Sequence, residues 1–497
     1  MSIESQNFAK SWKPQLILPF HKKKEKTKVE NYRPVSHLVE VGKLVEYIVG
    51  DQILEHFITN GLLHPNHHGS LKNHSTATAL IQLTDMWMKA SEKKELSGVC
   101  MIDQSAAYDL LSHEHFAEKL KLYNFDEASV NWCKSYLGGR TQCVQVESKT
   151  SDYLECEDSG APQGSILAGL FHMINSNDLP DCHEEGESVV YVDDDTDSVH
   201  ARHPDQLVEK LQREVNNTVS WLKDNRLCVA GDKSKLLIVG HPELRAARLT
   251  DLLAIEVDGQ QIEETASEKL LGIVINNKLS WKEHLYGDKD NPGLISQLKQ
   301  RVGTLRRLSK YMSKERLKMM VSGIFYSKLM YCLPVFGNVH GLAIYRDTRG
   351  RSAGMTMNDC NKLQVLQNSV NRLITGARHG VATADLLSDT NSLSIQQMVA
   401  YYTLIMVHKI TITGKPAYLA GRLKLRDEDE RELRGWGGRT VEIPDYSLET
   451  SRAGFVYRGG RLYNSVSRNL REEMSIPKFK EGAKKWVREQ IPVRPRR

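Results

Sequence analysis

YVDDDTD, residues 191–197, is an acidic run that stands between two segments with the composition of β-strands. Val189 to Val192 is an apolar strand and the chain returns through Thr196 to Val199, so the sequence predicts a β-hairpin that turns at the aspartates. A buried strand does not normally end in three charges without a use for them, because charges lose their hydration on burial. These aspartates are therefore candidate functional residues.

The acidic run has two other interpretations, a plain solvated turn and a calcium-binding loop. An isolated Asp-rich turn is more often a plain turn, and the buried strand before it argues against that here. In an EF-hand loop, Asp193, Asp195 and Asp197 would fill positions 1, 3 and 5. Position 6 is then Ser198 in place of glycine and position 12 is Pro204 in place of glutamate, which excludes an EF-hand.

Strand and helix patterns alternate around the hairpin. Val99 to Ile102 is a short buried strand that ends at Asp103, and a helical pattern that stops at Gly138 follows it. The further expected elements are strands at 141–147 and 153–157, a helix at 166–174 and a helix that starts at Pro204. The order strand, helix, strands, helix, hairpin, helix predicts an α+β fold, close to a ferredoxin-like sheet with helices on one face.

Asp103 follows one buried strand, and Asp193 with Asp194 lies at the turn of the strand that we expect beside it. Carboxylates brought together from adjacent strands repel one another unless a cation lies between them, and hard ions such as Mg²⁺ prefer oxygen ligands. Two such ions about 3.5–4 Å apart activate a 3′-hydroxyl and stabilise the leaving oxygen of an in-line phosphoryl transfer. The arrangement predicts nucleotidyl transfer.

Residues 294–320 are expected to form a helix pair of almost purely basic charge. Such single-sign clustering favours binding to a polyanion over a merely solvated face. The basic residues are Lys299, Arg301, Arg306, Arg307, Lys310, Lys314, Arg316 and Lys318, against the acid Glu315. Beyond them we expect a loop at 341–360, helices over 361–425, a charged and glycine-rich connection at 426–440 and a basic tail at 478–497.

The composition of the whole chain allows an anionic partner without requiring one. Its 497 residues carry a net charge of +5 and 40% of them are hydrophobic, enough for several domains with real cores. The eight cysteines contain no C-x-x-C pair, which indicates reduced thiols, and the absence of any run of about 18 apolar residues argues against a membrane span. We expect a soluble intracellular protein of the nucleus or the cytoplasm, and the abrupt start before HKKKEKTK suggests a fragment of a longer chain.

Seven segments in order resemble the reverse transcriptase domain of non-LTR retrotransposons, near the jockey and CR1-like elements. The segments are LPFHKKKEKTKVENYRPVS, MIDQSAAYDLLSHEHF, SGAPQGSILAGLF with NDLP downstream, YVDD, WLKDNRLCVAGDKSK, LLGIVINNKLSW and LQVLQNSVNRLITG. They are similar, respectively, to the family's entry motif, to its motifs A, B, C, D and E, and to the helix after its thumb. One such match would be weak, but seven in order, within residues 12–380, are specific.

The resemblance implies a right-hand polymerase with fingers, a ferredoxin-like palm, a helical thumb and a mainly helical C-terminal extension. It implies RNA-directed DNA synthesis with two Mg²⁺ ions, or Mn²⁺, acting on dNTPs, an RNA template and a DNA primer or target. The implied parts are the start of the fingers at 1–95, the palm at 96–245 with a fingers insertion at 111–160, the motif E hairpin and basic thumb at 246–340, and the extension at 341–497.

Carried over residue by residue, the resemblance makes Asp103, Asp193 and Asp194 metal ligands. Tyr108 matches the aromatic residue that excludes a ribose 2′-hydroxyl, which a ring achieves by steric clash. Gln163 matches the residue that positions the incoming nucleotide and the template, in a glycine-flanked loop where backbone approaches a ligand.

Three basic residues complete the implied site. Lys22 and Arg33 match the fingers groups that hold the triphosphate, and a guanidinium suits the bidentate geometry of phosphate. Lys233 matches the motif D lysine, a candidate general acid for the departing pyrophosphate. The basic thumb would hold the template–primer duplex through its phosphates.

The chain departs from the family pattern at two places near the site. Gly69-Ser70-Leu71 stands where many relatives have G-F-R, so an arginine is lost from the fingers that face the template. Asp195 is an unusual third acid after Y-x-D-D, and we expect it to lie beside the metals or to point to solvent.

Other interpretations remain open. One alternative is a degenerate remnant of a retrotransposon that only binds nucleic acid, and another is a domesticated binding protein that uses the basic thumb and tail. The sequence also has four closely spaced histidines, His64, His67, His68 and His74. We expect them to lie in a solvated loop, which is commoner than a metal site.

Overall fold

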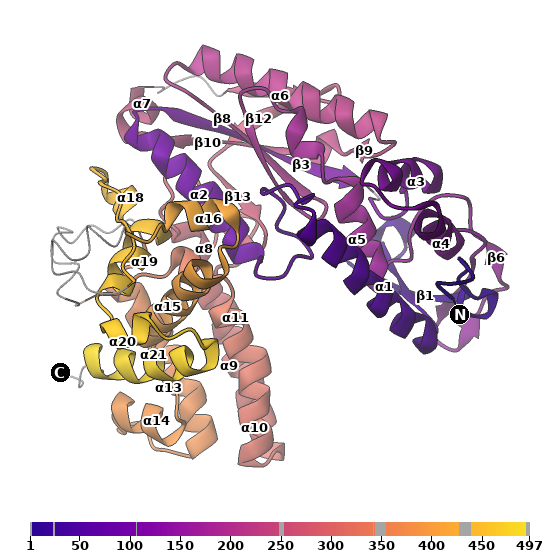
Figure 1. Cartoon of the computed structure of the whole chain (residues 1–497). Coiled ribbons are helices and arrows are strands. Elements are labelled where there is room, and N and C mark those ends of the chain that lie inside the picture. The colour runs from indigo at the N-terminus through magenta and orange to yellow at the C-terminus, as the bar shows by residue number, and fades with distance from the viewer. Residues whose placement is uncertain are drawn as a thin grey trace.

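The computed structural model describes residues 2–22, 25–105, 107–247, 253–340, 342, 354–426 and 439–493. Figure 1 shows a β-rich N-terminal half and a helical C-terminal half, which confirms the α+β fold class with its mainly helical C-terminal region. Among the described residues, no helix is long and apolar enough to cross a membrane.

The first sheet joins two segments that are far apart in the sequence. β1 (Gln15–His21) pairs antiparallel with β2 (Tyr32–His37) and parallel with β4 (Thr141–Val146). The short strands β5 (Lys149–Thr150) and β6 (Leu154–Glu155) also pair with β4. The helices of this part, which share one apolar core, are α1 (Glu40–Thr59), α3 (His113–Leu122), α4 (Glu127–Leu137) and α5 (Ile166–Asn175).

The central sheet carries the aspartates and has the strand order β11-β12-β10-β3-β8-β7, with β9 paired to the end of β3. Its strands are β3 (Leu96–Ser105), β7 (Glu187–Tyr191), β8 (Asp194–Ala201), β9 (Cys228–Val229), β10 (Lys235–Gly240), β11 (Ala254–Val257) and β12 (Gln260–Thr265). β3 continues to Ser105, so the expectation that Asp103 ends its strand is wrong. Asp103 lies inside β3, where the ladder to β8 holds its backbone.

Helices cover the central sheet on both faces, and the expected arrangement with helices on one face is wrong. Side chains alternate along β3, so Cys100 and Ile102 pack toward α6 (Pro204–Asp224), whereas Val99 and Met101 pack toward α2 (Thr76–Glu92). The run from Val99 to Ile102 is apolar at every position and not only at alternate ones. Such a run indicates a strand that is buried on both sides.

α2 also anchors the C-terminal helices to the sheet. Its Asp85 side chain is 5% exposed and accepts hydrogen bonds from Arg422 Nε at 2.7 Å and from Tyr418 Oη at 2.9 Å. Tyr446 Oη lies 3.3 Å from the same carboxylate. The helices that contact α2 on this side are α12 (Leu333–Phe336), α16 (Ala417–Arg422), α18 (Glu449–Arg452) and α19 (Phe455–Asn464).

A hairpin is present near LLGIVINNKLSW, but it starts earlier than expected. Its first strand, β13 (Ser267–Leu270), lies before that segment except for Leu270, and only β14 (Ile273–Asn276) falls within it. The expected basic helix pair is α9 (Leu294–Leu308) and α10 (Lys314–Val321), which forms an arm of the helical half in Figure 1 and packs along one side against α13 (Met357–Thr375). The other helices of this region are α8 (Lys282–Tyr286), α14 (Thr383–Asp389), α15 (Ile395–Thr413) and α21 (Ile476–Gln490). The helices expected over 361–425 are thus confirmed, with α13 starting at Met357 inside the segment expected to be a loop.

The expected basic tail is a packed helix over most of its length. α21 buries Phe479, Ala483 and Val487 against the C-terminal core, and it contacts α15. Its lysines and arginines therefore occupy the outer face of an amphipathic helix. Most of the glycine-rich connection expected at 426–440 lies outside the described residues.

Candidate active site

The β7–β8 hairpin turns at Val192 and Asp193. Tyr191 and Asp194 are the last paired residues of the two strands, so Asp193 projects from the turn itself. Val192 has a φ of +63°, a backbone conformation that β-branched residues rarely adopt. Strained residues of this kind gather at functional sites and persist only where neighbouring groups hold them.

Three carboxylates converge on this turn. Asp103 of β3 is the direct register partner of Asp194 of β8, and Asp193 precedes Asp194. Burial, and then the charges of Asp193 and Asp103, raise the pKa of Asp194 to about 6. Burial raises the pKa of Asp103, with Asp193 adding to the effect and Lys233 opposing it.

Burial and mutual repulsion favour a cation at these carboxylates. Their oxygen donors are the ligands that Mg²⁺ prefers, so the residues present fit the expected metal in their chemistry. Among the described residues, no group of three acidic, histidine or cysteine side chains is drawn together at ligand distances.

Two lysines face Asp103 from opposite parts of the chain. Lys233 lies at the end of the short 3₁₀ helix Gly231–Lys233, and its Nζ is 3.9 Å from Asp103 Oδ2. Lys22 follows β1, and its charge has a smaller lowering effect on the pKa of Asp103 than the charge of Lys233. Both lysines are within electrostatic reach of Asp103.

Tyr108 lies between the turn and the first sheet. Burial and the charge of Asp193 raise its pKa, while Arg33 of β2 lowers it, so the three side chains lie within electrostatic reach of one another. The Tyr108 ring also lies 5.5 Å from the ring of His172, centroid to centroid. The structure therefore brings Lys22, Arg33 and Tyr108 to the side of the aspartates that faces the first sheet.

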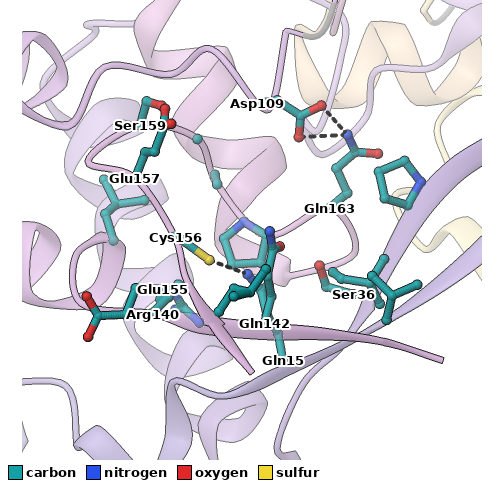
Figure 2. A pocket seen from close by; sticks show the side chains of 18 residues that line it. Gln15, Ser36, Asp109, Arg140, Gln142, Glu155, Cys156, Glu157, Ser159 and Gln163 are labelled. Atoms are coloured by element: carbon teal, nitrogen blue, oxygen red, sulfur yellow. Dashed lines mark hydrogen bonds between the residues drawn. The ribbon is translucent and has the colours of Figure 1, made fainter. Parts of the chain in front are cut away.

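Gln163 lies in a cavity of about 520 Å³ beside the first sheet, shown in Figure 2. Its Nε2 donates to both carboxylate oxygens of Asp109 at 3.0 Å, and its backbone oxygen accepts from Ser36 N at 2.7 Å. The amide side chain is thus oriented by Asp109, the residue after Tyr108. No expectation singled out Asp109, although it directly follows the predicted site residue Tyr108.

The basic residues of the helix pair are not equivalent. Lys299, Arg306, Arg307 and Lys310 are exposed on α9 and on the turn that follows it. Arg301 is half-buried and donates a hydrogen bond to the backbone oxygen of Ile324. These residues lie on the arm of Figure 1, on different elements from the aspartates.

Asp195 lies neither beside Asp193 nor in solvent, and both expectations for it are wrong. Side chains alternate along β8, so Asp195 points to the opposite face from Asp194, beneath α6. It is 1% exposed, and its Oδ1 accepts a hydrogen bond of 2.5 Å from Ser188 Oγ. The two-residue period of the strand, read from the sequence, could have shown which face it occupies.

A buried ionic cluster extends from this face to α6. His183 Nε2 lies 3.1 Å from Asp197 Oδ1, and His183 Nδ1 lies 3.3 Å from Glu214 Oε2. Thr218 Oγ1 donates to Asp197 Oδ2 at 2.8 Å. Burial lowers the pKa of His183, but the charge and hydrogen bond of Asp197, together with Cys182 and the charge of Asp195, raise it to about 11. Sequence reasoning missed this cluster, which ties the strand that begins at Asp194 to α6.

Two of the four histidines before α2 are buried, not solvated as expected, and His64 and His74 are partly buried. His67 and His68 are at most 1% exposed. His68 contacts Thr78 Oγ1 at 3.0 Å and Gln82 Oε1 at 2.8 Å, and burial lowers the pKa of His68 to about 3. The backbone of the segment runs beside β7, where His68 N donates to the Val190 oxygen at 2.9 Å.

Comparison with known proteins gives a consistent result. A family model described as "Reverse transcriptase (RNA-dependent DNA polymerase)" matches residues 21–275, slightly more than half of the chain. The chain is 26% identical to a probable RNA-directed DNA polymerase from transposon BS of Drosophila melanogaster, over 81% of this chain and 42% of that protein. It is 24% identical to the RNA-directed DNA polymerase from mobile element jockey of Drosophila funebris, over 74% of this chain and 38% of that protein. The chain spans about two fifths of the length of these relatives.

Solved structures give weaker matches. Telomerase from Candida Tropicalis in complex with a TWJ fragment of telomeric RNA aligns with a TM-score of 0.39 and 13% identity, over 79% of this chain and 62% of that chain. Apo telomerase from the same organism aligns with a TM-score of 0.39 and 11% identity, over 82% and 68% of the two chains.

Proposed function

Because this chain belongs to the reverse transcriptase (RNA-dependent DNA polymerase) family, we propose that it synthesises DNA on an RNA template for a non-LTR mobile element. In this reaction the 3′-hydroxyl of a primer attacks the α-phosphate of a dNTP. The observation that carries the proposal is the meeting of Asp103, Asp193 and Asp194 at one turn, where burial and mutual repulsion raise the pKa values of Asp103 and Asp194.

In the proposed site, Asp103 and Asp193 hold the metal ions and Asp194 supports them. When bound, two Mg²⁺ ions, or Mn²⁺, activate the primer hydroxyl and neutralise charge on the leaving phosphate oxygen. The protein orients these ligands through the β3–β8 ladder, which places Asp103 opposite Asp194. The ladder also explains why the carboxylates stay close despite their repulsion.

The groups around the aspartates have separate proposed roles. Lys22 and Arg33 bind the triphosphate, and Lys233 donates a proton to the departing pyrophosphate. Tyr108 lies under the sugar and excludes a 2′-hydroxyl by contact. Gln163, held by Asp109, positions the nucleotide and the template.

The elements around the site suggest how a template–primer duplex is held. The first sheet and its helices act as fingers, the central sheet as the palm and α9–α10 as the thumb. In this arrangement, duplex phosphates are contacted by four exposed residues, Lys299, Arg306, Arg307 and Lys310. Arg301 contributes through the guanidinium N–H groups that do not donate to the Ile324 oxygen. The C-terminal helices would support the palm through α2.

Primer extension with the Asp193→Asn variant tests the proposal. On an RNA template with Mg²⁺ and dNTPs, we expect the wild type to extend the primer and Asp193→Asn to lose extension, because the neutral amide no longer binds the metal. RNA binding, measured by fluorescence anisotropy, should remain nearly unchanged. Asp152→Asn, at an exposed position of the first half, is the matched control and should extend normally.

Two outcomes would contradict the proposal. Equal extension by the wild type and by Asp193→Asn would show that these carboxylates do not bind the metal. RNA binding by a wild type that never extends a primer would instead favour the alternative of a remnant that only binds nucleic acid.

A further inference from the structure

His172 of α5 contacts the strained turn directly. Its side chain is 1% exposed, and its Nε2 lies 3.1 Å from the backbone oxygen of Val192. A carbonyl oxygen only accepts, so Nε2 carries the proton and donates. The bond therefore holds the peptide that links Val192 to Asp193.

That peptide needs such support because Val192 is held at a φ of +63°. A β-branched residue in this region is strained, and the turn would relax if its neighbours did not hold it. On one side, Val190 is paired to the segment before α2, through bonds of 2.9 Å from His68 N and 3.1 Å to the Asn66 oxygen. His172 supplies a side-chain bond on the other side, at the residue before Asp193.

The His172 ring also contacts Tyr108. The two rings lie 5.5 Å apart, centroid to centroid, at an interplanar angle of 39°. Burial lowers the pKa of His172, although the charge of Asp193 opposes this.

We propose that His172 is a positioning residue that couples Tyr108 to the peptide of Asp193, and so sets both the metal-ligand geometry and the shape of the sugar pocket. The inference rests on the proposed function, but it concerns a residue to which the proposed mechanism gives no role. The bond to Val192 is expected to control metal binding and rate. The ring contact with Tyr108 is expected to control discrimination between dNTP and rNTP.

Two substitutions separate these effects. His172→Phe keeps a ring beside Tyr108 but removes the N–H donor. His172→Gln replaces the donor at a similar reach but removes the ring. Met173→Leu, at the neighbouring buried position of α5, is the control for packing alone.

Mn²⁺ affinity is measured by electron paramagnetic resonance of free Mn²⁺, and single-nucleotide incorporation is measured on an RNA-templated primer. For His172→Phe we expect the affinity for Mn²⁺ to fall severalfold and kcat to fall about tenfold, while the KM for dNTP stays within about twofold of the wild type. The reason is that the variant loses the hydrogen bond to the buried Val192 carbonyl, which holds the turn that carries Asp193. His172→Gln should restore most of the Mn²⁺ affinity and kcat while raising the ratio of rNTP to dNTP incorporation. Met173→Leu should change neither Mn²⁺ affinity nor that ratio, whatever it does to the melting temperature.

The inference is overturned if His172→Phe binds Mn²⁺ and incorporates dNTP as the wild type does. It is also overturned if His172→Phe and His172→Gln lose activity equally and in proportion to melting temperature, since that result is expected of a purely structural residue. Failure of the proposed function is distinguishable from both, because the wild type itself would then not extend a primer.

Discussion

Replacing Gly69 by alanine tests whether the position of the hairpin turn controls activity. A Cβ at Gly69 would lie 2.6 Å from both the backbone N and the Cγ2 of Val192, and 3.2 Å from its Cα. These atoms cannot rotate away, because they belong to the backbone and to a β-branched side chain, so the turn that carries Asp193 must shift. Overpacking of this kind costs about 1–3 kcal/mol. If the transition state bears that cost, the rate of incorporation falls roughly 5- to 150-fold, at about 1.36 kcal/mol for each factor of ten.

The assay is single-nucleotide incorporation on an RNA-templated primer, together with thermal unfolding. Gly169→Ala is the matched control, because the nearest atom to a Cβ there is Ser70 Oγ at 3.4 Å, an ordinary contact. Gly169 lies within α5, where alanine is favoured over glycine by about 0.5–1 kcal/mol, so this variant should keep its rate and gain slightly in stability. Wild-type rate and melting temperature in Gly69→Ala would refute the argument, since the turn would then tolerate displacement.

Three further predictions concern the sugar pocket, the basic arm and the buried cluster. For Tyr108→Ala we expect increased incorporation of rNTPs on an RNA-templated primer, and an unchanged ratio of rNTP to dNTP use would remove its role. Neutralising Arg306 and Arg307 together should make the dependence of duplex affinity on salt shallower, by about 1.8 in the slope of log K against log salt if both contact phosphates; an unaltered slope would contradict the thumb assignment. Raising the pH from 8 to 11 should lower the free energy of unfolding by up to about 1.4 kcal/mol per pH unit. The reason is that the pKa of His183 is raised to about 11 in the folded protein. Its stabilising contribution is complete below the unfolded-state pKa near 6.5 and is lost as the pH rises through about 11. Denaturant titrations of His183→Gln should show a flatter pH dependence over that range, and the same dependence as in the wild type would show that other groups cause it.

Several elements were predictable because their signals are local. The hairpin at the aspartates and the helix that starts at Pro204 follow from side-chain periodicity and proline, and the structure confirms them. The hairpin near LLGIVINNKLSW is also present, but it starts several residues earlier than expected. Asp103 and Asp194 were expected to be neighbours, and the register of β3 and β8 makes them direct partners.

Other features were not predictable, because they depend on which segments pack together. The sequence around His67 and His68 does not show that these histidines are buried. In the structure, His67 contacts the Ser176 oxygen at the end of α5, and His68 contacts Gln82 of α2. The sequence of α2 has helical composition, but it does not show that this helix lies between the central sheet and the C-terminal helices. In the structure, Asp85 of α2 accepts hydrogen bonds from Arg422 and Tyr418 of the C-terminal helices. The sequence separation of these partners exceeds 300 residues.

The sequence by itself predicted which acids lie together and in what order. Tyr191 sets the register of Y-x-D-D, whereas the period of the strand, which separates Asp194 from Asp195, was not applied to Asp195. Only the tertiary structure decided what surrounds these residues, because burial depends on contacts between distant segments. It placed α6 over Asp195 and Asp197, with His183 paired to Asp197, and it placed His172 and Gly69 against Val192, so that one strained peptide is held from two sides.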